Sequence, residues 1–203
     1  MPALKLVRYA LWSAVAILAA AVAWAYFGGK VGALPGGGPG ILSTADIGGP
    51  FSLIDQKGDT VTEAALKGKP SVIYFGYTYC PDVCPTTLAN LTTWLAKLGP
   101  DADKLKVFFV TVDPARDTRE AMGSYLEAFD PRIVGLTGAP DAVEKMLKEF
   151  RVYWRKIGDG PYYTMDHTAT LYLLDANGAF AGTIDYEEAA EVALKKLKNL
   201  VSS

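Results

Sequence analysis

Residues 72–87 constrain the fold and the chemistry of this chain more than any other segment, because they contain its only two cysteines, Cys80 and Cys84. The segment begins with Val-Ile-Tyr-Phe, a continuous apolar and β-prone run that predicts a buried strand ending at Gly76. Beyond the second cysteine, leucines recur at helical spacing, at positions 88, 91, 95 and 98. Both thiols are therefore expected where a core strand passes into a helix.

The two prolines of this segment suit the first position of a helix, so the helix is expected to begin near Pro81 or near Pro85. Either start places Cys84 in or beside the first turn and puts both cysteines on one helical face. Unpaired N–H groups and the helix dipole stabilise an anion there, so we expect the pKa of both thiols to be lowered. Such thiolates serve as nucleophiles or as soft metal ligands, whereas a structural disulfide or two inert buried thiols would be the simpler alternative.

Composition excludes one class of partner and narrows the choice of side chains for a site. The 203 residues carry a net charge of −2, without the clusters of Lys and Arg on which nucleic-acid binding depends. The chain has a single histidine, so any site that needs an imidazole must use His167.

An uncharged segment, residues 9–27, follows Arg8 and is rich in apolar residues, with aromatic residues near its ends. Its length suits a bilayer crossing, and the basic residues before it favour a cytoplasmic N-terminus. We therefore predict a membrane anchor in residues 1–29. A cleaved signal peptide, with small residues 21–23 as the cleavage site, is the alternative.

Residues 30–45 are rich in Gly and Pro, which predicts a flexible linker. A globular domain is expected over residues 46–203. Only eight residues precede the apolar segment, which leaves no room for a mitochondrial transit peptide. The expected location is the bacterial inner membrane, crossed once, with the C-terminal domain in the periplasm.

Strand and helix patterns alternate along the globular region and predict an α/β fold with a largely parallel sheet covered by helices. Two Asp-x-x-Glu patterns, at residues 117–120 and 141–144, look like capping boxes at helix starts. The strands are expected at residues 51–54, 60–62, 72–75, 105–112, 133–136, 168–174 and 179–184, and the last helix at residues 187–201.

Functional sites of such sheets form at the carboxyl ends of the parallel strands. The cysteine turn, Asp113 after the next long strand, and the loop before the final strands are all candidates for that edge. Asp113 either lies near the thiols and tunes them or, in the simpler interpretation that we favour, forms a turn with the proline that follows it. Tyr153 and Trp154 are expected to pack a hairpin around the turn at residues 158–161.

Three motifs in order carry a resemblance to a known family. They are Tyr-Phe-Gly-Tyr-Thr-Tyr-Cys80-Pro-Asp-Val-Cys84-Pro-Thr-Thr, then Val-Thr-Val-Asp113-Pro with Arg-Asp-Thr after it, then Asp166-His167-Thr. From about residue 51 to its end, the chain closely resembles the Sco/SenC family of copper chaperones, which have a thioredoxin-like fold. The resemblance implies copper ligands at Cys80, Cys84 and His167, and a role in assembling the binuclear copper centre of cytochrome c oxidase. It further implies two partners, the oxidase subunit that carries this centre and an upstream copper donor.

The residue types agree with this resemblance. Two soft thiolates suit Cu(I), an imidazole helps to retain Cu(II), and few ligands leave room for an incoming partner ligand. Zinc also accepts two Cys and one His with an open position. Asp166 either orients His167 through a hydrogen bond or caps a turn.

Three rival functions remain open at this stage. Cys80 and Cys84 can act as the catalytic redox pair of a thiol–disulfide oxidoreductase that keeps the oxidase cysteines reduced, which would not require His167. A peroxiredoxin-type peroxidase is suggested by Cys84-Pro-Thr, but Pro81 stands where that family has threonine. The third is a purely structural, membrane-anchored interaction domain, which would not explain why both cysteines lie between a core strand and a helix.

Overall fold

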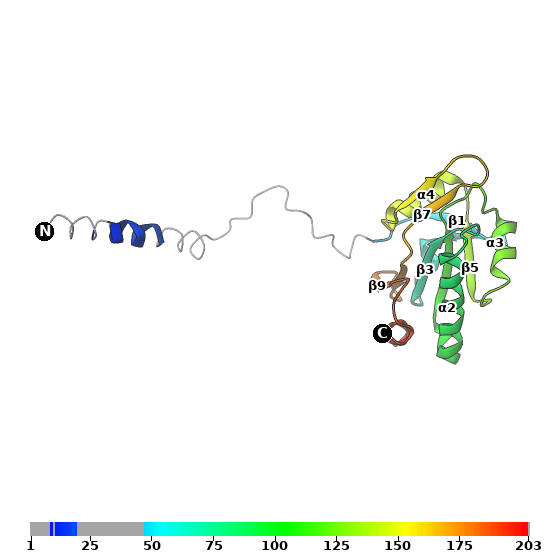
Figure 1. Cartoon of the computed structure of the whole chain (residues 1–203). Helices are drawn as coiled ribbons and strands as arrows, with labels where there is room; N and C mark the ends of the chain where they lie inside the picture. The colour runs from blue at the N-terminus through cyan, green and yellow to red at the C-terminus, as the bar shows by residue number, and fades with distance from the viewer. Residues whose placement is uncertain (1–8, 10, 20–46, 203) are drawn as a thin grey trace. The chain divides into compact units, whose positions relative to one another are not determined.

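The computed structural model describes residues 9, 11–19 and 47–202 (Figure 1). The chain divides into two units, residues 1–41 and 42–203, and each is described by itself. Residues 9 and 11–19 of the first unit are helical. The predicted linker and most of the predicted anchor lie outside the described residues, and within the described part no helix combines the length and apolarity that a membrane crossing requires.

The second unit is built on a seven-stranded mixed sheet whose strand order is β2-β1-β5-β4-β3-β8-β9. A separate two-stranded sheet, β6-β7, completes the strands of the described region. The strands are β1 (Ser52–Asp55), β2 (Thr60–Thr62), β3 (Ser71–Gly76), β4 (Lys106–Thr111), β5 (Ile133–Thr137), β6 (Trp154–Ile157), β7 (Thr164–His167), β8 (Leu171–Leu174) and β9 (Phe180–Ile184).

The strand before the cysteines, β3, lies inside the sheet, parallel to β4 and antiparallel to β8. All six of its residues are buried, because helices or loops cover the sheet on both sides. This arrangement explains why its sequence is continuously apolar rather than alternating. The predicted strand at residues 72–75 is confirmed, with one further residue at each end.

Two helices pack on one face of the sheet, as the register of the strands shows. Tyr74 pairs with Phe109 and Phe109 with Gly135, so these three residues share a face. A Cβ at Gly76, on the same face, would touch Cys84 of α2 (Val83–Leu98), and one at Gly135 would touch Met122 of α3 (Arg119–Leu126). Figure 1 shows α2 lying along the sheet in front of β3.

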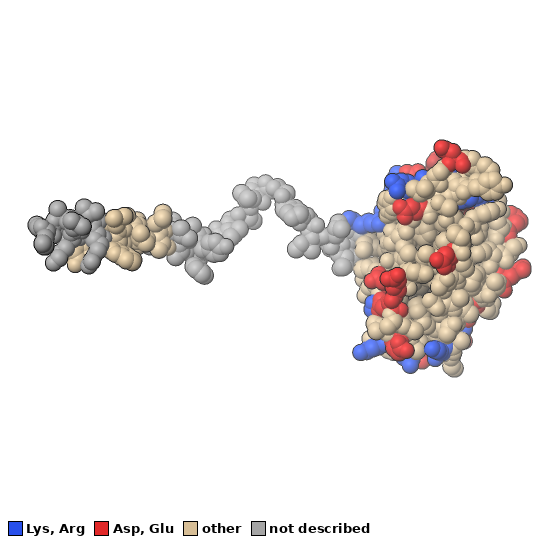
Figure 2. All heavy atoms as spheres, in the orientation of Figure 1, with Lys and Arg blue, Asp and Glu red and all other residues tan. Residues whose placement is uncertain are grey.

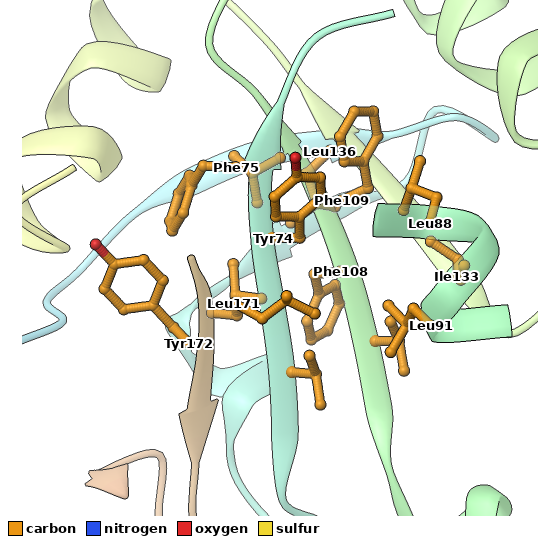
Figure 3. Packing of buried hydrophobic residues seen from close by; sticks show 14 of the residues in the cluster. Tyr74, Phe75, Leu88, Leu91, Phe108, Phe109, Ile133, Leu136, Leu171 and Tyr172 are labelled. Atoms are coloured by element: carbon orange, nitrogen blue, oxygen red, sulfur yellow. The ribbon is translucent and has the colours of Figure 1, made fainter. Parts of the chain in front are cut away.

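The remaining helices are α4 (Pro140–Glu149) and α5 (Ala190–Val201), with short 3-10 helices at Glu63–Leu66 and Gly99–Lys104. The ring of Phe150, just after α4, packs against Phe75 on the opposite face of the sheet from Tyr74. In Figure 3, Leu88 and Leu91 extend from α2 toward the strands, and Phe75 and Tyr172 lie on the other side of Tyr74. The core therefore has two layers, one on each face of β3.

Three predicted helix starts differ from those in the structure. Helix α2 begins at Val83, between the two prolines, with Asp82 at the N-cap. Pro85 is then the third helical residue, where a missing N–H costs nothing because the first turn has no partner for it.

Helix α4 begins at Pro140, without a side-chain cap, so the capping box predicted at Asp141 is wrong. Proline at the first helical position supplies the start instead.

The capping box predicted at Asp117 is also wrong. Thr118 is the N-cap of α3, and its hydroxyl accepts a hydrogen bond from the Ala121 N–H at 3.2 Å. The carboxylate of Asp117 is buried instead, where it accepts bonds from the Thr78 N–H, the Thr78 hydroxyl and the Thr111 hydroxyl. Asp117 thereby ties the loop after β3 to the end of β4.

Candidate metal centre

The two cysteines lie where β3 passes into α2, as the sequence predicts. Cys84 is the second residue of α2 and is fully buried, while Cys80, in the loop before the helix, is half-buried. The backbone N–H of Cys84 points at the Cys80 sulfur, 3.4 Å away. This is one of the N-terminal N–H groups that the helix itself leaves without a partner.

Gly76 makes room for the buried sulfur. A Cβ at this position would lie 2.8 Å from Cys84 Sγ and 2.7 Å from the ring of Phe109. The strand must therefore end on glycine for the first turn of α2 to approach the sheet this closely. The tight packing fixes where the Cys84 sulfur sits.

His167 reaches the sulfurs from a different part of the chain. It is the last residue of β7, in the β6–β7 hairpin, and its Nε2 lies 3.5 Å from Cys84 Sγ. Its Nδ1 lies 3.0 Å from the carbonyl oxygen of Thr168. Because a carbonyl oxygen can only accept, Nδ1 must carry a hydrogen, which leaves metal binding to Nε2.

The structure thus brings together the three residues that the sequence singled out. The Cys80 and Cys84 sulfurs and a ring nitrogen of His167 all lie within 4.8 Å of one another. That spacing lets one metal ion reach all three, and the donor set of two sulfurs and one imidazole fits copper or zinc. The predicted convergence at the carboxyl ends of the parallel strands is confirmed.

The two thiols differ in their acidity. The pKa of Cys80 is lowered to about 3, chiefly because the Cys84 thiol donates a hydrogen bond to its sulfur, with further help from His167 and from backbone N–H groups. The same hydrogen bond, together with burial, raises the pKa of Cys84. The expectation that both pKa values fall is therefore wrong for Cys84, because the pair shares one negative charge.

Aromatic side chains surround the site, and the sequence did not predict that they belong to it. The hydroxyl of Tyr74 donates a hydrogen bond to Cys84 Sγ at 3.5 Å, and burial raises the pKa of this phenol. The His167 ring meets Tyr77 edge-on, with centroids 5.7 Å apart. Tyr74 was counted as core because its strand is apolar throughout, and nothing in that pattern distinguishes a phenol at the site from one in the interior.

Asp166 does not orient His167, so that hypothesis is wrong. Its carboxylate lies 3.5 Å from the Tyr153 hydroxyl and 3.6 Å from Arg155. Neighbouring residues of a strand point to opposite faces, and Asp166 therefore faces away from His167. The alternative that it caps a turn is not observed either, and the Thr168 carbonyl oxygen performs the orienting role.

Asp113 lies near the site but contacts other groups than the thiols. It is buried, forms an ion pair with Arg116, and accepts a hydrogen bond from the Tyr163 hydroxyl at 2.7 Å. The hairpin predicted around residues 158–161 is confirmed, with Trp154 pairing with His167 across it. Trp154 packs against the core, whereas Tyr153 is exposed.

Comparison with known proteins agrees with this geometry. The SCO1/SenC family model matches residues 40–202. Protein SenC of Rhodobacter capsulatus is 39% identical over 155 residues, which cover 74% of this chain and 68% of that protein. Protein SCO2, mitochondrial, of Saccharomyces cerevisiae is 38% identical over 162 residues, 77% of this chain, and the chain spans only 54% of that relative's length.

Solved structures extend the likeness to the fold. The structure of Bradyrhizobium japonicum ScoI with copper bound has a TM-score of 0.71 and 47% identity, and the match covers 76% of this chain and 99% of that one. Yeast Sco1 with copper bound has a TM-score of 0.72 and 38% identity, covering 78% of this chain and 90% of that one. The α/β, thioredoxin-like fold expected from the sequence is confirmed. On the family model and these identities, the chain belongs to the SCO1/SenC family.

Proposed function

We propose that this protein is a copper chaperone that binds one copper ion through Cys80, Cys84 and His167 and delivers it to the binuclear copper centre of cytochrome c oxidase. The observation that carries the proposal is the convergence of two sulfurs and one imidazole within 4.8 Å. The copper-bound structures of two relatives support the choice of copper over zinc. The partners are the oxidase subunit that carries the copper centre and a protein that supplies the copper.

The site suits transfer better than permanent storage. Three ligands leave the coordination of the ion open to a donor group from a partner, and the half-buried Cys80 lies on the accessible side. Thiolates favour Cu(I), and the imidazole of His167 adds a nitrogen donor that Cu(II) accepts. Figure 2 shows few and scattered basic side chains on the face that it presents, so nothing on this face favours a nucleic-acid partner.

A copper titration of the full-length protein tests the binding step. The reduced protein should take up one equivalent of copper, and the disulfide form much less, because oxidation joins the two sulfurs and removes both thiolate donors. A Cys80→Ser, Cys84→Ser double variant serves as the control. Equal uptake by the reduced protein and by this variant would refute copper binding at the site.

We further propose that the protein is anchored in the bacterial inner membrane by residues 1–29, joined through the linker at residues 30–45 to a domain in the periplasm. The uncharged segment behind Arg8 supports this location. Protease added to spheroplasts should then digest the domain while cytoplasmic proteins survive. Full protection of the domain would overturn the location, and a mature protein that begins after residue 23 would overturn the anchor alone.

A thiol–disulfide reductase is the second candidate, favoured by the low pKa of the half-buried Cys80 thiol. In that reaction the Cys80 thiolate attacks a disulfide of the oxidase subunit and releases one substrate thiolate. Cys84 then attacks the mixed disulfide, so the substrate leaves with two thiols and Cys80 and Cys84 end as a disulfide. Two electrons pass to the substrate, and His167 has no required role.

Complementation separates the two candidates. In a strain that lacks the native gene, His167→Ala should lower oxidase activity at limiting copper, and added copper should partly restore it by mass action. A reductase predicts instead that His167→Ala is nearly silent and that either cysteine substitution abolishes function. Full activity of His167→Ala at limiting copper would favour the reductase.

A further inference from the structure

The β6–β7 hairpin, which carries His167, is not part of the main sheet. Its two strands pair only with each other, and three of the four residues of β6 are exposed. The seven-stranded sheet therefore does not fix the position of the imidazole. Contacts between the hairpin and the body of the domain must set its distance from the sulfurs.

One arginine makes several of these contacts. Arg116 lies in the loop between β4 and α3, with its side chain only 14% exposed, and pairs with the buried carboxylate of Asp113. Its Nη1 donates a hydrogen bond to the carbonyl oxygen of Tyr163, 2.9 Å away, and its guanidinium carbon lies 3.5 Å from the centre of the Tyr163 ring. The Tyr163 hydroxyl in turn donates to Asp113.

These contacts form a closed cycle, which we name the Arg116 clasp: Arg116, Asp113 and Tyr163. Tyr163 precedes β7 directly and so joins the clasp to the strand that ends in His167. The guanidinium also lies 4.8 Å from the centre of the Tyr79 ring, and Tyr79 is the residue before Cys80. The clasp therefore contacts both segments that supply candidate ligands.

We propose that Arg116 is a positioning residue, which holds the His167 imidazole over the two sulfurs and thereby sets how firmly the protein retains Cu(II). This inference rests on the proposed copper function. Two thiolates suffice for Cu(I), a soft ion that accepts few ligands, whereas Cu(II) depends on the nitrogen donor. Loss of the clasp should therefore weaken Cu(II) binding and leave Cu(I) binding nearly intact.

The reduced full-length protein and its Arg116→Ala variant are titrated with Cu(I) and with Cu(II) against competing chelators, and the Cu(II) complexes are examined by electron paramagnetic resonance. Residues that orient a histidine ligand typically contribute about 10–100-fold to metal affinity. We expect a loss of that size for Cu(II), with weaker nitrogen hyperfine structure, and a change of less than about threefold for Cu(I). Tyr163→Phe, which keeps the ring and removes only the hydroxyl contact to Asp113, should show a smaller loss of Cu(II) affinity.

A double-mutant cycle tests whether Arg116 acts through His167. If it does, Arg116→Ala should add little to the Cu(II) loss already caused by His167→Ala, because the imidazole is no longer present to be positioned. Additive losses would overturn the inference.

Arg132→Ala is the matched control. Arg132 forms an ion pair with Asp130 at the start of β5, at the opposite end of the strands from the thiols. It should leave both copper affinities unchanged, and equal effects of Arg116→Ala and Arg132→Ala would contradict positioning. Should Arg116→Ala fail to fold, Tyr163→Phe with unchanged Cu(II) affinity and spectrum would contradict it. A wild-type protein that takes up no copper would instead refute the proposed function.

Discussion

Cys80 and Cys84 carry the same functional group in very different surroundings. Hydrogen bonds from the Cys84 thiol and from backbone N–H groups lower the pKa of Cys80 to about 3. Because this pKa is lowered, we expect Cys80 to be a thiolate from about pH 4 upward in the reduced, metal-free protein. The pKa of the buried Cys84 is raised, so we expect Cys84 to keep its proton where Cys80 has lost its own.

Alkylation of the reduced, metal-free protein should therefore modify Cys80 first, at a rate that is nearly constant between about pH 5 and pH 8. An ordinary thiol would react about ten times faster for each unit of pH in this range. Mass spectrometry of peptides after timed iodoacetamide treatment measures both rates. In Cys84→Ala the thiol donor is lost, so the rate at Cys80 should regain a pH dependence. A rate in the wild type that rises tenfold per unit would contradict the lowered pKa.

Tyr74 offers a single-atom test of the same sulfur pair. Tyr74→Phe keeps the ring that stacks on Phe109 and removes only the hydroxyl that donates to Cys84 Sγ. Losing a bond of about 1 kcal/mol to the reduced sulfur should make the reduction potential of the cysteine pair about 20 mV more negative. Equilibration with a glutathione buffer measures the shift. An unchanged potential would show that the Tyr74 hydroxyl does not stabilise the reduced state.

At the residue scale, the sequence pointed to the three residues that the fold brings together, but not to the side chains around them. Cys80, Cys84 and His167 stood out because cysteines and histidines are so few in this chain. Tyr74 and Arg116 belong to the quoted motifs but were given no role of their own, since one lies in an apolar strand and the other in a loop with ordinary turn residues. Their roles depend on contacts between segments far apart in the sequence, which no local pattern records.

At the scale of elements, the junction of β3 and α2 shows how closely a helix must approach the sheet to place a thiol. Gly76→Ala puts a methyl group within 2.8 Å of the Cys84 sulfur and 2.7 Å of the Phe109 ring. Neither neighbour is the free end of a flexible side chain, so we expect a loss of about 1–3 kcal/mol in the free energy of unfolding and a weaker metal site. Denaturant unfolding and copper titration of the reduced protein measure the two effects.

Gly123→Ala provides the control for this substitution. Gly123 lies within α3, and a Cβ there would meet only Gln56, at an ordinary contact distance of 3.7 Å. Alanine should stabilise the helix by about 0.5–1 kcal/mol without any effect on copper. If Gly76→Ala proved as harmless as Gly123→Ala, the close approach of α2 to the strand would not be what positions Cys84.

Strands were easier to predict than helix starts. The buried strands β3 and β4 follow from apolar runs, and the β6–β7 hairpin follows from its turn residues. The two capping boxes failed because Asp117 is recruited by Thr78 and Thr111 from other elements, while Pro140 starts α4 by itself. A local pattern cannot show that a carboxylate has better partners elsewhere in the fold.

At the scale of the whole molecule, the alternation of strands and helices predicted an α/β fold, and the three central strands β3, β4 and β5 are parallel. The expectation of a largely parallel sheet is wrong, because the other four strand pairings are antiparallel. The strand order was beyond that reasoning, because β1 pairs with β5 and β8 with β3 across long stretches of sequence. The contact between Cys84 and His167 joins residues 83 positions apart. It was expected only because both segments were predicted at the same edge of the sheet.

Metal binding should therefore stabilise the fold as a whole. An ion held by both segments binds only the folded state, so copper at 100 times its dissociation constant should add about 2.7 kcal/mol and raise the melting temperature by roughly 5–10 °C. Calorimetry of the reduced protein with and without copper measures the shift. The Cys80→Ser, Cys84→Ser variant should show none, and a comparable rise in that variant would place the stabilising copper elsewhere.

The β6–β7 hairpin and the main sheet are expected to open at different rates, because they do not share a strand. Strand β3 is buried and bonded on both sides, so its amide hydrogens exchange with solvent only when the domain opens extensively. Each strand of the hairpin pairs with one neighbour only, so we expect the hairpin to open by smaller, more frequent fluctuations. Cys84, in the helix that packs on β3, is therefore expected to move more slowly than His167 on the hairpin. If the protein binds copper as proposed, we expect the hairpin to set the lifetime of the state with all three ligands bound, and release to begin at His167 while both sulfurs still hold the ion.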